Sequence, residues 1–379
     1  MSVKVAVLGA SYLQRPLYEK LRELGVFSVG ISWDKEEDCV KDGLVDKFYE
    51  ISIIEKDKVL DVCEKEGISG IVSIASDVAV PIASYVAEKL NLIGNSVLSS
   101  LWSTNKNEMR KRFKKHSLPI PDFCEVTCLK DAKDFLEKSS KDLILKPSDR
   151  SGSLGVQFVP KTTKENDLSQ WVDLAISSSF SKTAILEEFI IGREISVEYI
   201  SFEGKHYFLN TTDKVTSGPP HYVELEQHQP AFINDELLHK VKDIVPRGLD
   251  SLGIKTGASH TELLIDNQQQ IWITEIGARM GGDFIGSTLT KLSTGYDFVE
   301  GVINASLGKF EKPEITQNRY SGVLFLSKET KSILKIIQST DDQRVVESKI
   351  MTNELKQVKK SSDRSGYLIY QSSERFEVE

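Results

Sequence analysis

Short apolar segments alternate with segments of helical periodicity over the first ninety residues of the chain. The apolar segments of strand length are residues 3–8, 26–32, 47–51 and 70–74. The segments with apolar side chains at helical spacing are residues 12–24, 56–66 and 80–90. Strands that alternate with helices form parallel sheets with helices packed on their faces. The pattern therefore predicts an α/β domain of the doubly wound type at the start of the chain.

The first strand-to-helix turn argues against a dinucleotide site. Dinucleotide-binding domains carry G-x-G-x-x-G at this turn, where the glycines allow the pyrophosphate and the helix to approach closely. Only the first glycine, Gly9, is present, and Gln14 stands at the position of the third. A bulky side chain there obstructs the packing of helix against strand, so the binding of NAD is disfavoured.

Length and composition exclude several classes of protein. The chain has 379 residues, and 48 Lys and Arg against 56 Asp and Glu give it a net charge of −8. This length predicts two or three domains, and the acidic balance argues against nucleic acid as a partner. No apolar stretch is long enough to span a membrane and no targeting signal is evident, so we expect a cytoplasmic protein without a membrane partner. Of the four cysteines only Cys124 and Cys128 are close in sequence, and no second pair of ligands completes a zinc site.

A strand that ends in a lysine begins the first segment with chemical character. Residues 143–147 are apolar except for Lys146, and a loop of small residues follows. The small residues are Ser151, Gly152, Ser153 and Gly155. An ammonium group beside backbone N–H groups suits phosphate oxygens, and residues 156–159 predict a second strand, which makes a hairpin over a nucleotide. The segment is not a P-loop, because its lysine precedes the glycines. A mobile hairpin with a solvated lysine is the alternative.

The second segment has the pattern of a strand, a short linker and a strand. Glu187 stands just before the apolar linker residues Phe189 and Ile190, and Glu194 follows the linker. The Glu187 carboxylate and the linker backbone can meet an adenine edge, and Glu194 can accept hydrogen bonds from ribose hydroxyls. An amphipathic hairpin with glutamates facing water explains this segment equally well.

The third segment predicts a β-hairpin with two opposed carboxylates. Glu262 and Glu275 lie at equal distances from the centre of the polar turn at residues 266–270, so they should pair across the hairpin. Like charges in that position destabilise a sheet, and a hard cation removes the conflict. Mg²⁺ is commonly held by one or two carboxylates together with substrate phosphates. The segment therefore predicts a metal site for a nucleotide, with two glutamates on an exposed face as the alternative.

These three segments, in this order, resemble the ATP-grasp superfamily. Its members include D-alanine–D-alanine ligase, biotin carboxylase, carbamoyl phosphate synthetase and the L-amino-acid ligases. The resemblance covers roughly residues 1–310 and implies an ATP-grasp fold, of α/β and α+β type, behind a Rossmann-like domain. It implies three parts: residues 1–104 as the Rossmann-like domain, residues 105–310 as the ATP-grasp domain with a lid at about 116–190, and residues 311–379 as a small C-terminal lobe containing β-structure.

The resemblance also implies roles for individual residues. Lys146 and the earlier Lys106 match the lysines that contact ATP phosphates, although Asn105 stands where the motif of Lys106 usually has Asp. The loop from Ser151 to Gly155 matches the loop that covers the phosphates. The adenine, ribose and metal positions of the family correspond, in that order, to Glu187 with Phe189 and Ile190, to Glu194, and to Glu262 with Glu275.

One departure from the family pattern points to a branch within it. Many members have an Asn two residues after the second metal-binding glutamate, whereas this chain has Gly277. The run Glu-x-x-x-Arg-x-Gly-Gly is similar to the carboxylate–amine ligase branch, in which the arginine stabilises the phosphate and the tetrahedral intermediate. Arg279 suits this role because its planar fork binds oxyanions bidentately, and Gly281 and Gly282 leave room for substrate.

The acceptor side of the site is harder to predict. Residues 205–232 form a polar stretch interrupted by glycine and proline, of the kind that forms loops over active sites. The resemblance implies that this region lines the substrate pocket, which makes Glu224 and His228 candidate substrate contacts. His260 shares a strand face with Glu262 and is a weaker candidate. For each residue, a structural position without a catalytic role is the alternative.

The resemblance implies an ATP-dependent ligase that activates a carboxylate as an acylphosphate and joins it to an amine. Its cofactors would be ATP and Mg²⁺, with Mn²⁺ as an alternative ion. Its partners would be small-molecule carboxylates and amines, with a homodimer left open. Two other hypotheses remain: an enzyme that makes carboxyphosphate or carbamoyl phosphate from bicarbonate, and a catalytically silent nucleotide-binding regulator.

Overall fold

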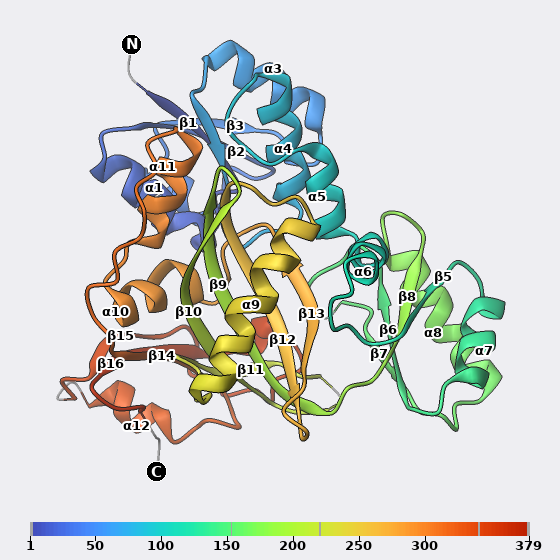
Figure 1. Cartoon of the computed structure of the whole chain (residues 1–379). Helices are drawn as coiled ribbons and strands as arrows, with labels where there is room; N and C mark the ends of the chain where they lie inside the picture. The colour runs from blue at the N-terminus through green and yellow to red at the C-terminus, as the bar shows by residue number, and fades with distance from the viewer. Residues whose placement is uncertain (1–2, 153, 220, 340–341, 377–379) are drawn as a thin grey trace.

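The computed structural model describes residues 3–152, 154–219, 221–339 and 342–376. Three sheets carry the fold, and helices pack against each of them (Figure 1). One sheet belongs to the N-terminal region, one to the segment that Figure 1 draws in green, and the largest joins the middle of the chain to its C-terminal part. No helix within these residues is both long enough and apolar enough to cross a membrane.

The N-terminal sheet is parallel and has the strand order β3-β2-β1-β4. Its strands are β1 (Lys4–Leu8), β2 (Phe27–Ser32), β3 (Lys47–Glu50) and β4 (Gly70–Val72). Its helices are α1 (Arg15–Glu23), α2 (Asp38–Lys41), α3 (Lys56–Glu66) and α4 (Ala79–Lys89). The predicted strand–helix alternation is confirmed. Gln14 is buried in the turn after β1 and donates to the backbone oxygen of Ile74 at 2.9 Å, so its side chain fills the space that the fingerprint glycine would leave open.

Two helices, α5 (Val97–Thr104) and α6 (Lys106–Lys115), lead from this region into a second sheet. The second sheet has the order β5-β8-β6-β7, and its strands are β5 (Phe123–Val126), β6 (Leu143–Pro147), β7 (Gln157–Val159) and β8 (Ala184–Glu188). Helices α7 (Leu129–Lys138) and α8 (Glu165–Ser178) bury their apolar faces against it. Strands β6 and β7 pair as the antiparallel hairpin expected from the sequence.

The third sheet has eight antiparallel strands in the order β13-β12-β9-β10-β11-β14-β16-β15. Its first strands are β9 (Gly192–Phe202), β10 (Lys205–Thr216), β11 (Glu224–Gln229), β12 (Gly257–Asp266) and β13 (Ile271–Gly277). Helix α9 (Asp235–Ser251) covers β13, and a π-helical turn (Ile285–Leu289) leads into α10 (Thr290–Thr294) and α11 (Phe298–Ser306).

The C-terminal strands β14 (Tyr320–Leu326), β15 (Val345–Ile350) and β16 (Gly366–Ser372) extend this same sheet, because β14 pairs with β11. Helix α12 (Ile333–Gln338) packs beside them. The C-terminal segment therefore contains the expected β-structure, and its strands are continuous with the sheet of the central region. The division into three parts at residues 104 and 310 stays a prediction.

The linker between β8 and β9 passes from the second sheet to the third. Strand β8 pairs with β5 and β6, whereas β9 pairs with β10 and β12. The hairpin alternative for this segment is therefore wrong. The two strands do not pair with each other, and the apolar linker at residues 189–191 lies where the two sheets join.

Candidate active site

Strands β12 and β13 place two carboxylates opposite each other. Glu262 pairs with Glu275 across the hairpin, which confirms the register expected from the sequence. The turn fixes this register, because one Asp266 carboxylate oxygen accepts from the backbone N–H groups of Gln268 and Gln270, both at 2.9 Å. The local sequence therefore determines which two side chains meet.

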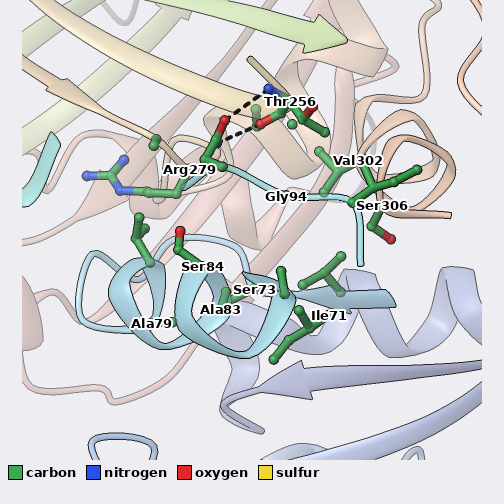
Figure 2. Close-up of a pocket in the computed structure, with 18 residues that line it drawn as sticks. Ile71, Ser73, Ala79, Ala83, Ser84, Gly94, Thr256, Arg279, Val302 and Ser306 are labelled. Carbon is green, nitrogen blue, oxygen red and sulfur yellow. Dashed lines mark hydrogen bonds between the residues drawn. The ribbon is translucent and has the colours of Figure 1, made fainter. Parts of the chain in front are cut away.

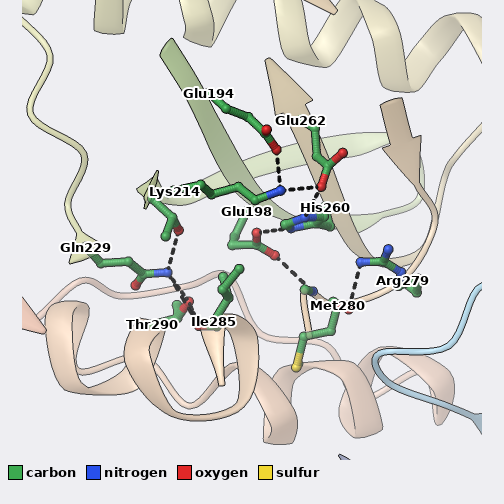
Figure 3. Close-up of polar contacts among 12 residues, drawn as sticks. Glu194, Glu198, Lys214, Gln229, His260, Glu262, Arg279, Met280, Ile285 and Thr290 are labelled. Atoms are coloured by element: carbon green, nitrogen blue, oxygen red, sulfur yellow. Dashed lines mark hydrogen bonds and ion pairs between the residues drawn. The ribbon is translucent and has the colours of Figure 1, made fainter. Parts of the chain in front are cut away.

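Lysines from two other elements compensate the opposed charges, and Figure 3 shows the Lys214 ammonium between Glu194 and Glu262. Lys214 of β10 lies 2.7 Å from a Glu262 oxygen and also bonds Glu194 of β9, and Lys106 of α6 lies 3.1 Å from Glu275. Burial would raise the pKa of Glu262, but the charges of Lys214 and His260 hold it well below its usual range. We call these residues the hairpin cluster: Lys106, Glu194, Lys214, Glu262 and Glu275.

The oxygen donors of the hairpin cluster fit a magnesium ion. Carboxylate oxygens are the ligands that this ion prefers, and it needs only one or two from protein when phosphates supply the rest. Glu262 and Glu275 are part-exposed and could turn from their lysines to a cation. Within the part of the chain that the structure describes, no group of three or more His, Cys, Asp or Glu side chains is arranged as a complete metal site. The geometry therefore suits a metal that arrives with a phosphate ligand.

Lys106 stands at the N-terminus of α6, between the hairpin and the loop after β6. Asn105 caps this helix by accepting from the N–H groups of Asn107 and Glu108. An amide oxygen thus does the capping that the usual Asp of the motif would do. The Lys106 ammonium donates to the Arg150 carbonyl at 2.9 Å and lies near Glu275, so it links the loop to the hairpin cluster.

Lys146 and Glu187 form a buried ion network with Arg110 of α6. The Lys146 ammonium lies 2.9 Å from one Glu187 oxygen, and the Arg110 Nε donates to the other. Burial would raise the pKa of Glu187, but the two cations lower it to about 2. We call Arg110, Lys146 and Glu187 the lid triad. Its carboxylate is already bonded on both oxygens, so the adenine contact expected of this side chain would require one cation to leave.

The loop after β6, which the sequence predicts to cover the ATP phosphates, is anchored to a neighbouring segment. Asp149 anchors it, because its carboxylate accepts from the backbone N–H groups of Phe180 and Ser181 at 2.9 and 2.7 Å. Gly152 and Gly155 have φ values of +64° and +71°, where a side chain would be strained. Ser151 is exposed on this loop, and Ser153 lies outside the described residues.

Two aromatic rings stand beside the linker. Phe189 packs edge-on against Phe158 of β7, with ring centroids 4.9 Å apart and an interplanar angle of 73°. The Phe189 N–H donates to the Asp142 carbonyl at 2.9 Å, which fixes the start of the linker, and Ile190 follows it. Phe189 and Ile190 therefore border the β5-β8-β6-β7 sheet, where the sequence predicts the adenine. Glu194, predicted for the ribose, is the Lys214 partner described above.

Arg279 makes a bidentate ion pair with Asp77, which follows β4 in the N-terminal region. Its Nε donates to Asp77 Oδ1 at 2.8 Å and its Nη2 to Asp77 Oδ2 at 3.1 Å. Burial would lower the pKa of Arg279, but Asp77 and, more weakly, Glu275 and Glu262 raise it. The arginine thus lies within electrostatic reach of the hairpin cluster and stays charged.

Glu198 links His260 to Gly281, and Figure 3 shows the Glu198 carboxylate beside the His260 ring. One oxygen of the buried Glu198 lies 2.5 Å from His260 Nδ1, and the other accepts from the Gly281 N–H at 3.3 Å. A Cβ on Gly281 would lie 2.8 Å from His260 Nδ1, so only glycine allows this approach. Burial would lower the pKa of His260, but Glu198 raises it to about 9. Gly282 follows and lines a small cavity that faces Ala75.

Strand β11 separates the two predicted substrate contacts onto opposite faces of the sheet. His228 pairs with Asp213, a neighbour of Lys214 that points to the other face. Its ring nitrogens bond Tyr370 and Glu226, both at 2.9 Å, and the side chain is buried. A register shift between Val215 and Thr216 turns Glu224 back toward Lys214, 3.8 Å away. The structure therefore groups Glu224, and not His228, with the hairpin cluster.

Four residues near the site were not found by sequence reasoning: Arg110, Lys214, Asp77 and Arg364. Arg364 comes from the C-terminal segment and binds both Glu224, at 3.2 Å, and Asp283, at 2.8 Å. Nothing in its local sequence predicts this contact, because its partners are more than eighty residues away. Lys214 lies in the polar stretch at residues 205–232, but no motif distinguishes it from the other polar residues there.

Comparison with protein families decides the fold family of this site. Residues 139–287 match the family model described as the ATP-grasp domain. This segment is an ATP-grasp domain. It contains the lid triad residues Lys146 and Glu187 and all of the hairpin cluster except Lys106. The resemblance stated from the sequence motifs is confirmed, and so is the predicted fold class.

Relatives of the ATP-grasp domain protein include ligases. Alanine–anticapsin ligase of Bacillus subtilis (strain 168) is 25% identical over 245 residues, which are 60% of this chain and 51% of that protein. An L-arginine-specific L-amino acid ligase of Bacillus subtilis is 21% identical over 285 residues, 74% of this chain and 67% of that protein. The chain thus spans about half the length of the first of these relatives.

A solved structure resembles the chain over nearly all of its length. The L-amino acid ligase from Bacillus licheniformis superimposes with a TM-score of 0.81 at 22% identity, covering 98% of this chain and 94% of that one. At this identity the likeness shows a shared fold. That fold extends from the N-terminal sheet to the C-terminal strands.

Proposed function

We propose that the protein is an ATP-dependent ligase that joins a carboxylate to an amine. The observation that carries the proposal is the hairpin cluster, in which opposed carboxylates of the large sheet meet two lysines, with Arg279 within electrostatic reach. Relatives named as ligases of amino acids support it. Phosphoryl transfer to a carboxylate needs positioning and charge stabilisation, which this arrangement can supply.

The proposed reaction has two steps. In the first, a carboxylate oxygen of the substrate attacks the γ-phosphorus of ATP, the bond to the bridging oxygen breaks, and ADP leaves with an acylphosphate formed. In the second, an amine attacks the acyl carbon, the C–N bond forms, and phosphate leaves. The amine releases a proton to solvent or to a nearby base. No covalent bond to the protein is needed.

The side chains have separate tasks in this reaction. Glu262 and Glu275 would hold Mg²⁺, or Mn²⁺ in its place, and the bound ion neutralises charge on the ATP phosphates. Lys106 and Lys146 contact phosphate oxygens, and the Ser/Gly loop that follows Lys146 covers them. Arg279 stabilises the negative charge on the transferred group and on the tetrahedral intermediate. Glu224 borders the side of the site where the organic substrates enter.

The test is the release of ADP from Mg-ATP with a panel of carboxylates and amines. The panel contains amino acids singly and in pairs, formate, and bicarbonate with and without ammonia. We expect turnover that requires an organic carboxylate and an amine together. Turnover with bicarbonate alone would support the carboxyphosphate alternative, and tight ATP binding without turnover in any mixture would support a regulator. Either result would reject the ligase proposal.

A further inference from the structure

The ion pair of Asp77 and Arg279 joins two parts of the molecule that are far apart in the sequence. Asp77 lies in the segment between β4 and α4 of the N-terminal region, and Arg279 follows β13 of the ATP-grasp domain. Both side chains are largely buried, with 17% and 16% of their surface exposed. Both partners lose most of their hydration in such surroundings. The pair therefore offsets that loss only when its two hydrogen bonds are well aligned.

The way in which Asp77 binds the guanidinium leaves one edge of it available. Asp77 takes the edge formed by Nε and Nη2, at 2.8 and 3.1 Å. Among the residues that the structure describes, the edge formed by Nη1 and the second N–H of Nη2 makes only a long contact of 3.4 Å to the Met280 carbonyl. Because guanidinium is a rigid planar fork, a partner on the first edge fixes the direction of the second. The pairing therefore orients Arg279 without using up its capacity for an oxyanion.

The backbone around the pair is shaped to allow it. A Cβ on Gly277 would lie 3.2 Å from Asp77 Oδ1 and 3.3 Å from Arg279 Nε, so the absent side chain leaves the space that the pair fills. Ala75, two residues before Asp77, has a φ of +57°, a conformation that costs energy for a residue with a side chain. Strain of this kind persists where the surrounding structure requires it.

The remainder of the Arg279 side chain leaves the edge of an apolar cavity. This cavity lies between α4 and the start of β12 and is lined by small residues such as Ala79, Ala83 and Gly94 (Figure 2). In Figure 2 the guanidinium points away from the cavity, and Glu262 and Glu275 contribute to the electrostatic surroundings of its charge. The head group is therefore bound by Asp77 and lies within electrostatic reach of Glu262 and Glu275.

We propose that Asp77 is a positioning residue that holds Arg279 with its free edge toward the phosphoryl group, across the junction of the N-terminal region and the ATP-grasp domain. The inference rests on the proposed function, because it takes Arg279 as the residue that binds this group. It adds a contribution of the N-terminal region to the site. It also gives a reason for glycine at position 277, where a larger side chain would displace the pair.

The test measures anion binding and does not require the organic substrates. Orthovanadate, a mimic of the transferred phosphoryl group, is titrated calorimetrically into the protein saturated with Mg-ADP. We expect Asp77→Asn to weaken orthovanadate binding about tenfold, since loss of an outer-shell partner typically costs about 10- to 100-fold. The affinity for Mg-ADP should change less than twofold. Asp77→Glu, which restores the charge, should recover part of the lost affinity.

Two further variants keep the proposal open to rejection. Asp297, the N-cap residue of α11, has a similar exposure and pairs with Lys20 and Lys291, so Asp297→Asn weakens these ion pairs and should leave orthovanadate binding unchanged. Gly277→Ala keeps both charges of the pair but crowds it, so it should also weaken orthovanadate binding. This variant replaces Asp77→Asn as the test if Asp77→Asn is too unstable to measure. Wild-type affinity in both Asp77→Asn and Gly277→Ala would overturn the inference, as would unchanged affinity in Arg279→Ala. Absence of ligase turnover with these binding effects intact would reject the proposed function alone.

Discussion

The lid triad and the hairpin cluster are both networks of opposite charges, and they differ in what they leave unbonded. The triad sets one carboxylate between two cations, and the Glu187 side chain is only 2% exposed. The cluster sets three carboxylates around two lysines, and its glutamates are 24–32% exposed while its lysines lie deeper. The triad is therefore closed, whereas the cluster offers oxygen atoms to a ligand.

This difference separates structural from functional charge. A buried carboxylate that is bonded on both oxygens contributes mainly to the stability of the fold. Its removal would leave the two cations buried without a partner. Opposed carboxylates that are partly open are held together against their repulsion, and a cation relieves that repulsion. We therefore expect substitutions in the cluster to affect turnover, and substitutions of the triad carboxylate to affect stability.

The largest effect is expected from Glu275→Gln in the hairpin cluster. The amide keeps the shape of the side chain and its contact with Lys106, but it loses the charge that a divalent ion needs. We expect turnover with Mg-ATP to fall at least about 10²- to 10³-fold, the size seen when one charge-stabilising group is lost. The assay is ADP release as a function of magnesium concentration, with the stability to urea expected to stay near that of the wild type.

The matched control for this prediction is Glu188→Gln. Glu188 pairs with Lys141 at 2.7 Å at the end of β8, outside the cluster, and its loss should leave turnover nearly unchanged. A Glu275→Gln protein with the wild-type rate at every magnesium concentration would reject the assignment of this carboxylate to the metal.

In the lid triad, Glu187→Gln should reverse the pattern of effects. An amide cannot balance Arg110 and Lys146, and breaking a buried ion pair from one side costs about 3–5 kcal/mol. We expect the free energy of unfolding in urea to fall by about this amount. Lys146 loses an anchor, so nucleotide affinity should also decline, but less than turnover declines in Glu275→Gln. Equal stability of the variant and the wild type would contradict the closed character of the triad.

The pH dependence of this stability has a defined direction. Burial opposes ionisation of Glu187, but the cations win and its pKa falls to about 2 in the folded protein, below the value of about 4.3 of an unfolded glutamate. The unfolded state therefore binds the proton first as the pH falls. The contribution of about 3 kcal/mol should be complete above pH 4.5 and decline as the pH falls toward 2. Comparing wild type with Glu187→Gln between pH 6 and pH 3 isolates it, and a constant difference would reject it.

Local patterns made part of this structure predictable. The N-terminal alternation of strands and helices and the β12–β13 register both follow from short-range signals, because a strand period and a tight turn act over a few residues. The opposition of Glu262 and Glu275 could be derived for the same reason. The departure at Asn105 from the usual Asp of the motif does not remove the cap of α6, because an amide oxygen accepts the same backbone hydrogen bonds as a carboxylate.

Contacts between distant segments were not predictable in this way. Arg110 meets Glu187 across 77 residues and Asp77 meets Arg279 across 202, and no spacing rule connects such positions. The sheet face that each candidate substrate contact, Glu224 or His228, occupies could not be predicted for a different reason. A one-residue shift in the β10–β11 register reverses the face on which a side chain lies, and a sequence does not mark where the shift occurs.

The smallest effect is expected from Phe158→Leu. This variant tests whether the sheet that carries the lid triad also contacts the adenine base of the nucleotide. The Phe158 ring packs edge-on against Phe189 at the linker and is 37% exposed, so it keeps a surface for an adenine. A pair of aromatic rings contributes about 0.5–1.5 kcal/mol beyond its buried area. If Phe158 and the adenine form such a pair, its loss should lower Mg-ADP affinity about two- to tenfold. Calorimetric titration of Mg-ADP measures it, with Phe232→Leu, whose ring is 75% exposed on another segment, as the control. If both variants bind Mg-ADP as the wild type does, the adenine does not contact Phe158. The lid triad would then contribute to nucleotide binding only through Lys146 and the phosphates.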